Sequence, residues 1–101
     1  MGALSGQVAV ISGASRGIGA AIARELGEHG ASVLINYANS AAPAEALARE
    51  LREGGKAGEV LVHQADMTDE AQARGMVEGA FARFGRVDIL INNAAITRDK
   101  T

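Results

Sequence analysis

Residues 12–19 read Ser-Gly-Ala-Ser-Arg-Gly-Ile-Gly, and this glycine-rich run lies between two segments of different character. Before it, residues 7–11 (QVAVI) form a short β-rich apolar run that can be buried on both faces. After it, Ile18, Ile22 and Leu26 recur at helical spacing. The glycines allow a sharp turn and a close backbone approach, and the first N–H groups of the following helix face an anion. The run therefore predicts a phosphate-binding turn in preference to a flexible loop.

Composition limits what the chain can be. It has 101 residues, of which 48% are hydrophobic, with no cysteine and a formal net charge of −2. We expect one small domain over residues 1–101, without disulfides or thiolate metal sites. The sequence shows no apolar run of membrane-spanning length and no secretory signal. Its slightly negative net charge does not indicate binding to nucleic acid. These features predict a cytoplasmic protein that binds neither membrane nor nucleic acid.

Short apolar runs alternate with helical patterns along the whole chain. The expected strands are Val8 to Ile11, Val33 to Ile35, Val60 to Val62 and Val87 to Ile91. The expected helices are Gly17 to Glu28, Ala42 to Glu53 and Asp69 to Phe84. Helices that join consecutive apolar strands imply right-handed crossovers and a parallel sheet, with a ligand crevice at the carboxyl ends of the strands. The pattern predicts an α/β fold.

The third expected helix has one apolar face and a defined start. Its inward-facing residues are predicted to be Ala73, Val77, Ala80, Phe81 and Phe84. Thr68 is the predicted N-cap, followed by Asp69 and Glu70 in the first turn, where the helix dipole favours acids.

If the predicted turn binds the phosphates of a dinucleotide cofactor, the end of the second strand, residues 36–40 (NYANS), bears on whether that cofactor is NAD or NADP. A site for NAD usually has an acid there to hold the ribose 2′-hydroxyl, but no acid occurs between Glu28 and Glu45. A carboxylate would repel a 2′-phosphate, whereas Arg16, with Asn39 and Ser40 as donors, can bind one. The sequence thus favours NADP(H) over NAD, although Arg16 is alternatively a solvated loop cation.

The ends of the third and fourth strands carry further polar residues. Asp66 is placed to accept a hydrogen bond from the adenine amine, or to cap the next helix beside Thr68; the two roles are compatible. The fourth strand ends in residues 92–95 (NNAA), two amides followed by small residues. Such residues fix loops and let a ribose approach closely.

Together these motifs resemble the short-chain dehydrogenase/reductase family. SGASRGIG is similar to its Thr-Gly-x-x-x-Gly-x-Gly motif, Asp66 to its adenine-binding acid, and NNAA to its Asn-Asn-Ala-Gly motif. The segments NYANS and NNAAITRD (92–99) look especially like 3-oxoacyl-acyl-carrier-protein reductases, with acetoacetyl-CoA reductases nearby. The resemblance implies the N-terminal, partial Rossmann domain of a family member, with three layers and a parallel sheet of strand order 3-2-1-4.

The resemblance also implies a site for NADP(H). Its pyrophosphate and 2′-phosphate side would be formed by Gly13, Ser15, Arg16, Gly17, Ile18 and Gly19. Its adenosine side would be formed by Tyr37, Asn39 and Ser40 at the ribose and by Asp66 and Met67 at the adenine. Near the nicotinamide-side ribose would lie Asn93, Ala94 and Ala95, while Asn92 would brace the central strands. Two residues depart from the motifs: Ser12 replaces Thr but keeps the hydroxyl, and Ala95 replaces Gly and adds a Cβ near the cofactor.

The activity that the resemblance implies is the NADPH-dependent reduction of a 3-oxoacyl thioester, carried by acyl-carrier protein or CoA, as in fatty acid biosynthesis. By the resemblance, the catalytic Asn, Ser and Tyr-x-x-x-Lys of the family would lie beyond residue 101, and the single tyrosine, Tyr37, is followed by Ala41 at the lysine position. We therefore assign no catalytic residue and no metal site, and expect the chain alone to be inactive without a C-terminal half.

Two other hypotheses remain at the level of sequence. One is a stand-alone half-Rossmann module that binds dinucleotide without catalysis; the unpaired edge of its fourth strand would predict association into a homo-oligomer. The other is a methyltransferase-like domain, which also has a glycine turn after its first strand. That domain usually has an acid at the end of the second strand, where this chain has Asn36 and Tyr37, so it ranks last.

Overall fold

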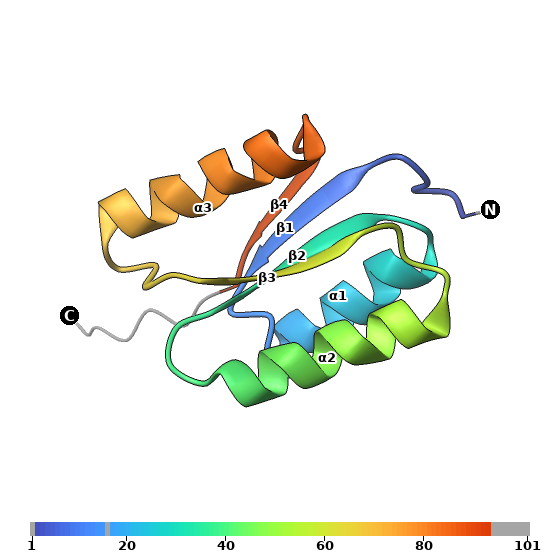
Figure 1. The fold of residues 1–101 in the computed structure, drawn as a ribbon, viewed down its shortest axis with the longest axis horizontal. Helices are drawn as coiled ribbons and strands as arrows, with labels where there is room; N and C mark the ends of the chain where they lie inside the picture. The colour runs from blue at the N-terminus through green and yellow to red at the C-terminus, as the bar shows by residue number, and fades with distance from the viewer. Residues whose placement is uncertain (1, 16, 94–101) are drawn as a thin grey trace.

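A computed structural model describes residues 2–15 and 17–93 of the chain. Helices and strands alternate within them as expected (Figure 1). The strands are β1 (Val8–Ser12), β2 (Ser32–Tyr37), β3 (Val60–Gln64) and β4 (Ile89–Asn92). The helices are α1 (Gly17–Glu28), α2 (Ala41–Gly54) and α3 (Glu70–Phe84). Every expected element is present, with ends shifted by no more than a few residues.

The strands form one parallel sheet in the order β3-β2-β1-β4. Val10, in the middle of β1, lies opposite Leu34 of β2 on one side and Leu90 of β4 on the other. All five residues of β1 are buried, as expected for a strand with neighbours on both sides and helices over both faces. The predicted α/β fold and strand order are confirmed.

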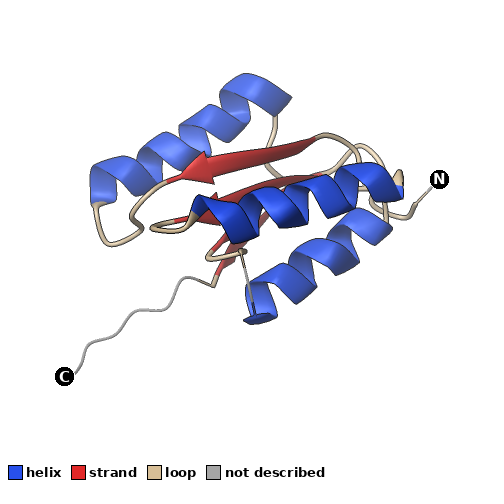
Figure 2. Ribbon diagram, turned by 60° about the horizontal axis from the view of Figure 1, so that its bottom comes forward, coloured by secondary structure: helices blue, strands red, loops and turns tan. Residues whose placement is uncertain are grey.

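Helices cover the two faces of the sheet unequally: α1 and α2 lie on one face and α3 lies on the other (Figures 1 and 2). On the face covered by α1 and α2, the larger hydrophobic cluster contains the strand residues Ile11, Val33 and Ile35. Val10 and Leu34 pack toward α3, where Met76 and Ala80 are fully buried. The molecule thus has the three predicted layers, and the sheet's alternating side chains divide its core in two.

The predicted inward face of α3 is wrong at one position. Phe81 is 52% exposed, whereas Met76, which the prediction omitted, is completely buried. Met76 and Ala80 are four residues apart and therefore share one side of the helix. Phe81 lies about 100° further round the axis from Ala80, and this turns its ring away from the sheet.

The start of α3 also differs from the prediction. The N-cap is Asp69, not Thr68: the Asp69 carboxylate accepts hydrogen bonds from the backbone N–H groups of Ala71 and Gln72. The Thr68 hydroxyl donates instead to Oδ1 of Asp66 at 2.6 Å. Asp and Thr both cap helices well, but the bond to Asp66 holds the Thr68 hydroxyl in the preceding turn, and Asp69 caps the helix instead.

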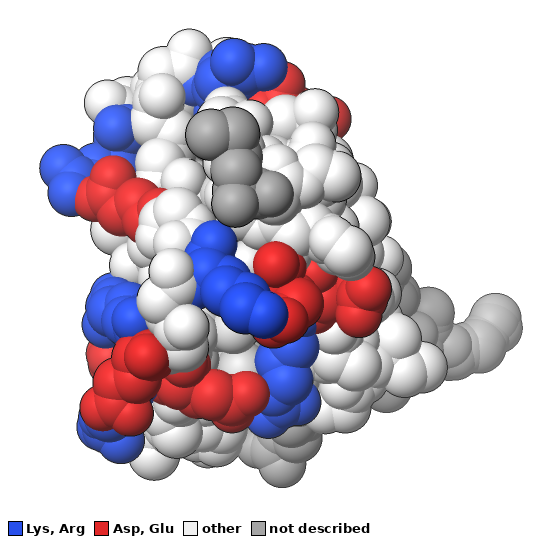
Figure 3. Space-filling model, turned by 90° about the vertical axis from the view of Figure 1, so that its right-hand side faces the viewer, with Lys and Arg blue, Asp and Glu red and all other residues white. Residues whose placement is uncertain are grey.

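Acidic and basic side chains are interspersed on the surface that Figure 3 shows. Two ion pairs join α1 to α2 and to the loop that follows it: Arg24 with Glu50 at 2.8 Å, and Glu28 with Lys56 at 2.7 Å. Both pairs are solvent-exposed, so they contribute little to stability. No helix among residues 2–15 and 17–93 is both long enough and apolar enough to span a membrane.

Candidate functional site

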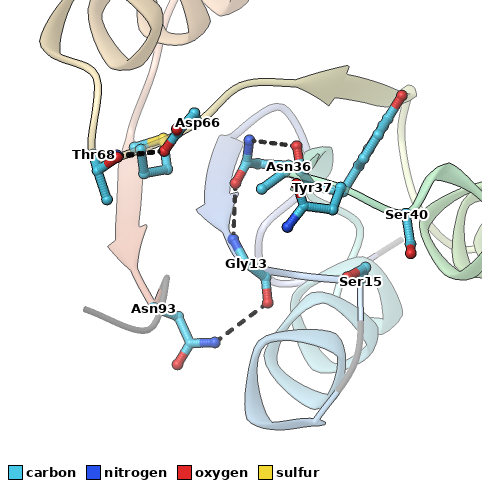
Figure 4. Close-up of a pocket in the computed structure, with 11 residues that line it drawn as sticks. Gly13, Ser15, Asn36, Tyr37, Ser40, Asp66, Thr68 and Asn93 are labelled. Atoms are coloured by element: carbon cyan, nitrogen blue, oxygen red, sulfur yellow. Dashed lines mark hydrogen bonds between the residues drawn. The ribbon is translucent and has the colours of Figure 1, made fainter. Parts of the chain in front are cut away.

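A cavity of about 420 Å³ opens at the carboxyl ends of the strands (Figure 4). Its walls come from the turn after β1, the segment after β2, the loop between β3 and α3, and the end of β4. The described residues that line it are Gly13, Ser15, Asn36, Tyr37, Ala38, Asn39, Ser40, Asp66, Met67, Thr68 and Asn93. A crevice at this edge is where open α/β sheets bind ligands.

Most of the residues that the sequence singled out meet at this cavity. Those that line it are Gly13, Ser15, Tyr37, Asn39, Ser40, Asp66, Met67 and Asn93. Gly17, Ile18 and Gly19 lie beside it in the first turn of α1 but do not line it. Arg16, Ala94 and Ala95 lie outside the described residues. The side chain of Asn36 and the residues Ala38 and Thr68 belong to the lining but were not predicted.

The glycine turn after β1 is held by hydrogen bonds from two sides. Gly13 has a φ of 61°, a left-handed conformation that favours glycine. Its N–H donates to Oδ1 of Asn36 at 2.9 Å, and its carbonyl accepts from Nδ2 of Asn93 at 3.5 Å (Figure 4). The turn is therefore tied to both neighbouring strands of β1.

Gly19 lets α1 approach this turn closely. A Cβ at this position would lie 2.5 Å from the Gly13 carbonyl oxygen and 2.6 Å from Nδ2 of Asn93. Both distances are shorter than van der Waals contact allows. The missing side chain at Gly19 thus lets the N-terminus of α1 lie against the glycine turn.

Ile18 does not join the core stripe of α1. Its side chain is 72% exposed, while Ile22 and Leu26 pack against the larger hydrophobic cluster. Helical spacing predicted one stripe for all three residues, but Ile18 stands in the first turn of the helix, next to the cavity. A large apolar side chain exposed beside a cavity is available for contact with a ligand.

The end of β2 contains a buried amide. Asn36 is 2% exposed, and its side chain lies in the floor between the glycine turn and the end of β3. Tyr37, Asn39 and Ser40 follow along the wall of the cavity. Residues 36–40 contain no acid, so this wall carries no carboxylate. The sequence contained one signal for Asn36, a polar residue directly after a fully apolar strand core.

The end of β3 carries the acid of the cavity lining. Oδ1 of Asp66 accepts from the Thr68 N–H at 2.9 Å and from the Thr68 hydroxyl. These two bonds hold the pKa of the Asp66 carboxyl below its ordinary value, so it is ionised at neutral pH. The Asp66 N–H donates to the side-chain oxygen of Gln72, which anchors the loop to α3.

The end of β4 is joined to β1 through Ser12. The Asn93 N–H donates to the Ser12 hydroxyl at 2.8 Å, and that hydroxyl lies 3.2 Å from Oδ1 of Asn92. Asn92 thus links β4 to β1, where it was expected to brace the central strands; in the described sheet β4 pairs with β1 alone. The residues 2–15 and 17–93 contain no cluster of three or more His, Asp or Glu side chains that could hold a metal ion.

Comparison with known proteins identifies the family. A family model described as short chain dehydrogenase matches residues 7–101. The chain belongs to the short-chain dehydrogenase family. An uncharacterized oxidoreductase of Methylorubrum extorquens is 48% identical over 96 residues, which are 95% of this chain and 38% of the relative. A 3-oxoacyl-[acyl-carrier-protein] reductase of Synechocystis is 41% identical, over 98% of this chain and 39% of the relative.

A solved short chain dehydrogenase from Burkholderia cenocepacia, in complex with NADP, has the same fold. It superimposes with a TM-score of 0.88 at 41% identity, covering 97% of this chain and 39% of that one. This short-chain dehydrogenase chain therefore spans somewhat more than a third of the length of the relatives it matches, and corresponds to their N-terminal part.

Proposed function

We propose that the chain is the NADP(H)-binding part of a carbonyl oxidoreductase. The observation that carries this proposal is the cavity at the carboxyl edge of the sheet, which has the glycine turn on one side and the acid-free end of β2 on the other. The related Burkholderia structure contains NADP, which supports the same cofactor here.

Each part of the cavity matches a part of that cofactor. The turn at Gly13 and the start of α1 offer N–H groups and the positive end of the helix dipole to the pyrophosphate. Asn39 and Ser40 are neutral hydrogen-bond donors for a 2′-phosphate, with Arg16 as its cation. Asp66 accepts from the adenine amine, with Met67 against the ring.

The remaining assignments concern the nicotinamide half. Asn93, directly after β4, lies across the glycine turn from β2 and lines the cavity. With Ala94 and Ala95 it is proposed to border the ribose next to the nicotinamide. NADPH supplies a hydride to a carbonyl carbon when bound.

We further propose a 3-oxoacyl thioester as the substrate of the whole protein. Relatives in Synechocystis and Staphylococcus aureus are named 3-oxoacyl-[acyl-carrier-protein] reductases, at 41% and 42% identity. The proton for the reduced carbonyl oxygen must come from a Tyr-x-x-x-Lys pair like that of the family. The 101 residues contain no such pair, so this activity requires further polypeptide.

The first test measures cofactor choice by titrating NADPH and NADH into the chain and its Asn39→Asp variant. A carboxylate introduced beside the 2′-phosphate should weaken NADPH binding by roughly five- to tenfold and leave NADH binding nearly unchanged. The difference should shrink at high salt, because both charges are solvent-accessible.

Gln7→Glu is the matched control. It adds the same charge before β1, at the opposite edge of the sheet, and should change neither affinity. Equal affinity of the unaltered chain for both cofactors would contradict the NADP(H) assignment.

The second test supplies the missing chemistry. The chain is fused to the C-terminal part of the Synechocystis reductase, and NADPH oxidation is followed with an acetoacetyl thioester. We expect turnover that disappears when the supplied tyrosine is changed to phenylalanine. A fusion that folds and binds NADPH but reduces no 3-oxoacyl thioester would contradict the proposed substrate.

A further inference from the structure

Asn36 makes more hydrogen bonds than its place in an apolar strand requires. Its Oδ1 accepts from the Gly13 N–H at 2.9 Å. Its Nδ2 lies 3.2 Å from the carbonyl oxygen of Ala65, 3.3 Å from that of His63 and 3.4 Å from that of Tyr37. The amide has one orientation that satisfies these partners, because the reverse would place an N–H against an N–H and an oxygen against carbonyl oxygens.

These bonds reach both neighbours of β2. The sheet order places β2 between β1 and β3, so a side chain at its end can contact the turn after β1 and the end of β3 together. The Asn36 backbone adds to this link, since its carbonyl accepts from the Ala14 N–H at 3.1 Å. Figure 4 shows the amide between Gly13 on one side and the β3 end that leads to Asp66 on the other.

The two segments that Asn36 joins are the two halves of the cavity. Gly13 belongs to the turn proposed for the pyrophosphate, and Ala65 directly precedes the acid proposed for the adenine. Asn36 itself is almost inaccessible, at 2% exposure. Its influence on a ligand must therefore pass through the backbone groups that it holds.

We propose that Asn36 is a positioning residue that couples the adenosine half of the cavity to the phosphate half. Occupation of the adenosine side fixes the end of β3, and the Asn36 amide transmits that order to the Gly13 N–H. The inference rests on the proposed NADP(H) site and adds to it a link between its two halves. Such coupling is a free energy shared between two sites, carried here by one side chain.

An aspartate at this position would separate the two functions of the amide. Asn36→Asp keeps an acceptor for the Gly13 N–H but loses both donors to the carbonyl oxygens of β3. Asn36→Ser is the second variant: its hydroxyl is polar but too short to reach both sides, and it places no charge in the floor. Either variant is used once its circular dichroism and cooperative unfolding show a native fold.

The experiment measures amide hydrogen exchange by NMR, with and without adenosine 2′-monophosphate. This probe has the adenine, ribose and 2′-phosphate but no pyrophosphate, so it fills the adenosine side alone. In the unaltered chain we expect exchange at the Ala65 and Gly13 amides to slow together, the latter by roughly fivefold or more. In the variants the slowing should stay at Ala65 and be lost at Gly13.

Ser32→Ala is the matched control at the other end of β2. The Ser32 hydroxyl accepts from the Glu59 N–H at 2.9 Å, so this variant also removes a side-chain bond between β2 and the start of β3. It should lower overall stability without changing the response of Gly13 to the probe. Equal slowing at Gly13 in the Asn36 variants, or no slowing there in the unaltered chain, would overturn the coupling.

Failure of the proposed function has a different signature. If the unaltered chain binds neither adenosine 2′-monophosphate nor NADPH, the cofactor site is wrong. The positioning role is then decided without ligand: Asn36→Asp must speed exchange at Gly13 and Ala65 together. A change at one of the two amides alone would overturn it.

Discussion

At the scale of single residues, the site depends on what Gly19 lacks. The first turn of α1 touches the Gly13 carbonyl and the Asn93 amide because no side chain intervenes. The contact joins the glycine turn and the start of α1 to Asn93, which is distant from both in the sequence, and it sets how closely the helix N-terminus approaches the turn. A glycine pattern in the sequence predicts such a contact but does not identify the atoms that meet.

Gly19→Ala should lower the free energy of unfolding by about 1–3 kcal/mol, because the added methyl group must displace the backbone at Gly13 and Ala14 as well as the side-chain amide of Asn93. It should also weaken NADPH binding. Urea unfolding and cofactor titration measure the two effects.

Gly75→Ala provides the control within α3. A Cβ there meets nothing within 4 Å, so the substitution should stabilise the chain by about 0.5–1 kcal/mol through helix propensity. Equal effects of the two substitutions would contradict the close approach at Gly19.

At the scale of elements, the start of α3 shows two adjacent residues with different tasks. Asp69 caps the helix through the Ala71 and Gln72 N–H groups, and Thr68 fixes the Asp66 carboxylate in the cavity wall. One residue therefore stabilises the helix, while its neighbour shapes the adjoining site.

Asp69→Ala should cost about 1 kcal/mol of stability, the usual effect of losing an N-cap. Thr68→Val, which removes the hydroxyl bond to Asp66, should leave the helix cap intact and raise the pKa of the Asp66 carboxyl. Thermal unfolding measures the first effect, and NMR titration of the carboxyl carbon measures the second. A larger loss of helix stability from Thr68→Val would contradict the assignment of the cap.

At the scale of the whole molecule, distant parts of the chain are joined at both edges of the sheet. At the amino ends of the strands, Oδ2 of Asp88 accepts from the Val8 N–H at 2.8 Å and from Nε of Arg86 at 2.9 Å.

The outer side of β4 is a separate feature. Within the described residues β4 pairs with β1 alone, and Leu90 on it is 56% exposed. That the outer side of β4 receives further polypeptide or a second copy of the chain stays a prediction.

Asp88 makes the stability of the molecule sensitive to acid. The bonds from Arg86, and then from the Val8 N–H, lower the pKa of its carboxyl in the folded state. Its stabilising contribution is therefore complete above the unfolded pKa of about 3.9 and is lost as the pH falls through the lower folded value. Asp88→Asn should make the acid loss of stability shallower, as measured by urea unfolding over a pH series.

Arg86→Leu gives the intermediate case. It removes the larger cause of the lowered pKa but leaves the bond from Val8, so its pH dependence should lie between those of the unaltered chain and Asp88→Asn. Identical pH profiles for all three chains would contradict a role for Asp88 in acid sensitivity.

The sequence by itself determined the alternation of strands and helices, the glycine turn and most of the cavity lining. These features follow from local periodicity, from turn chemistry and from the rule that parallel strands end at one edge. The tertiary structure alone decided which side of α3 faces the sheet and that Asn36 joins the turn to the end of β3. Both depend on how segments far apart in the chain pack together: Phe81 is exposed by the position of its helix, and the partners of Asn36 are assembled only when β1, β2 and β3 lie side by side.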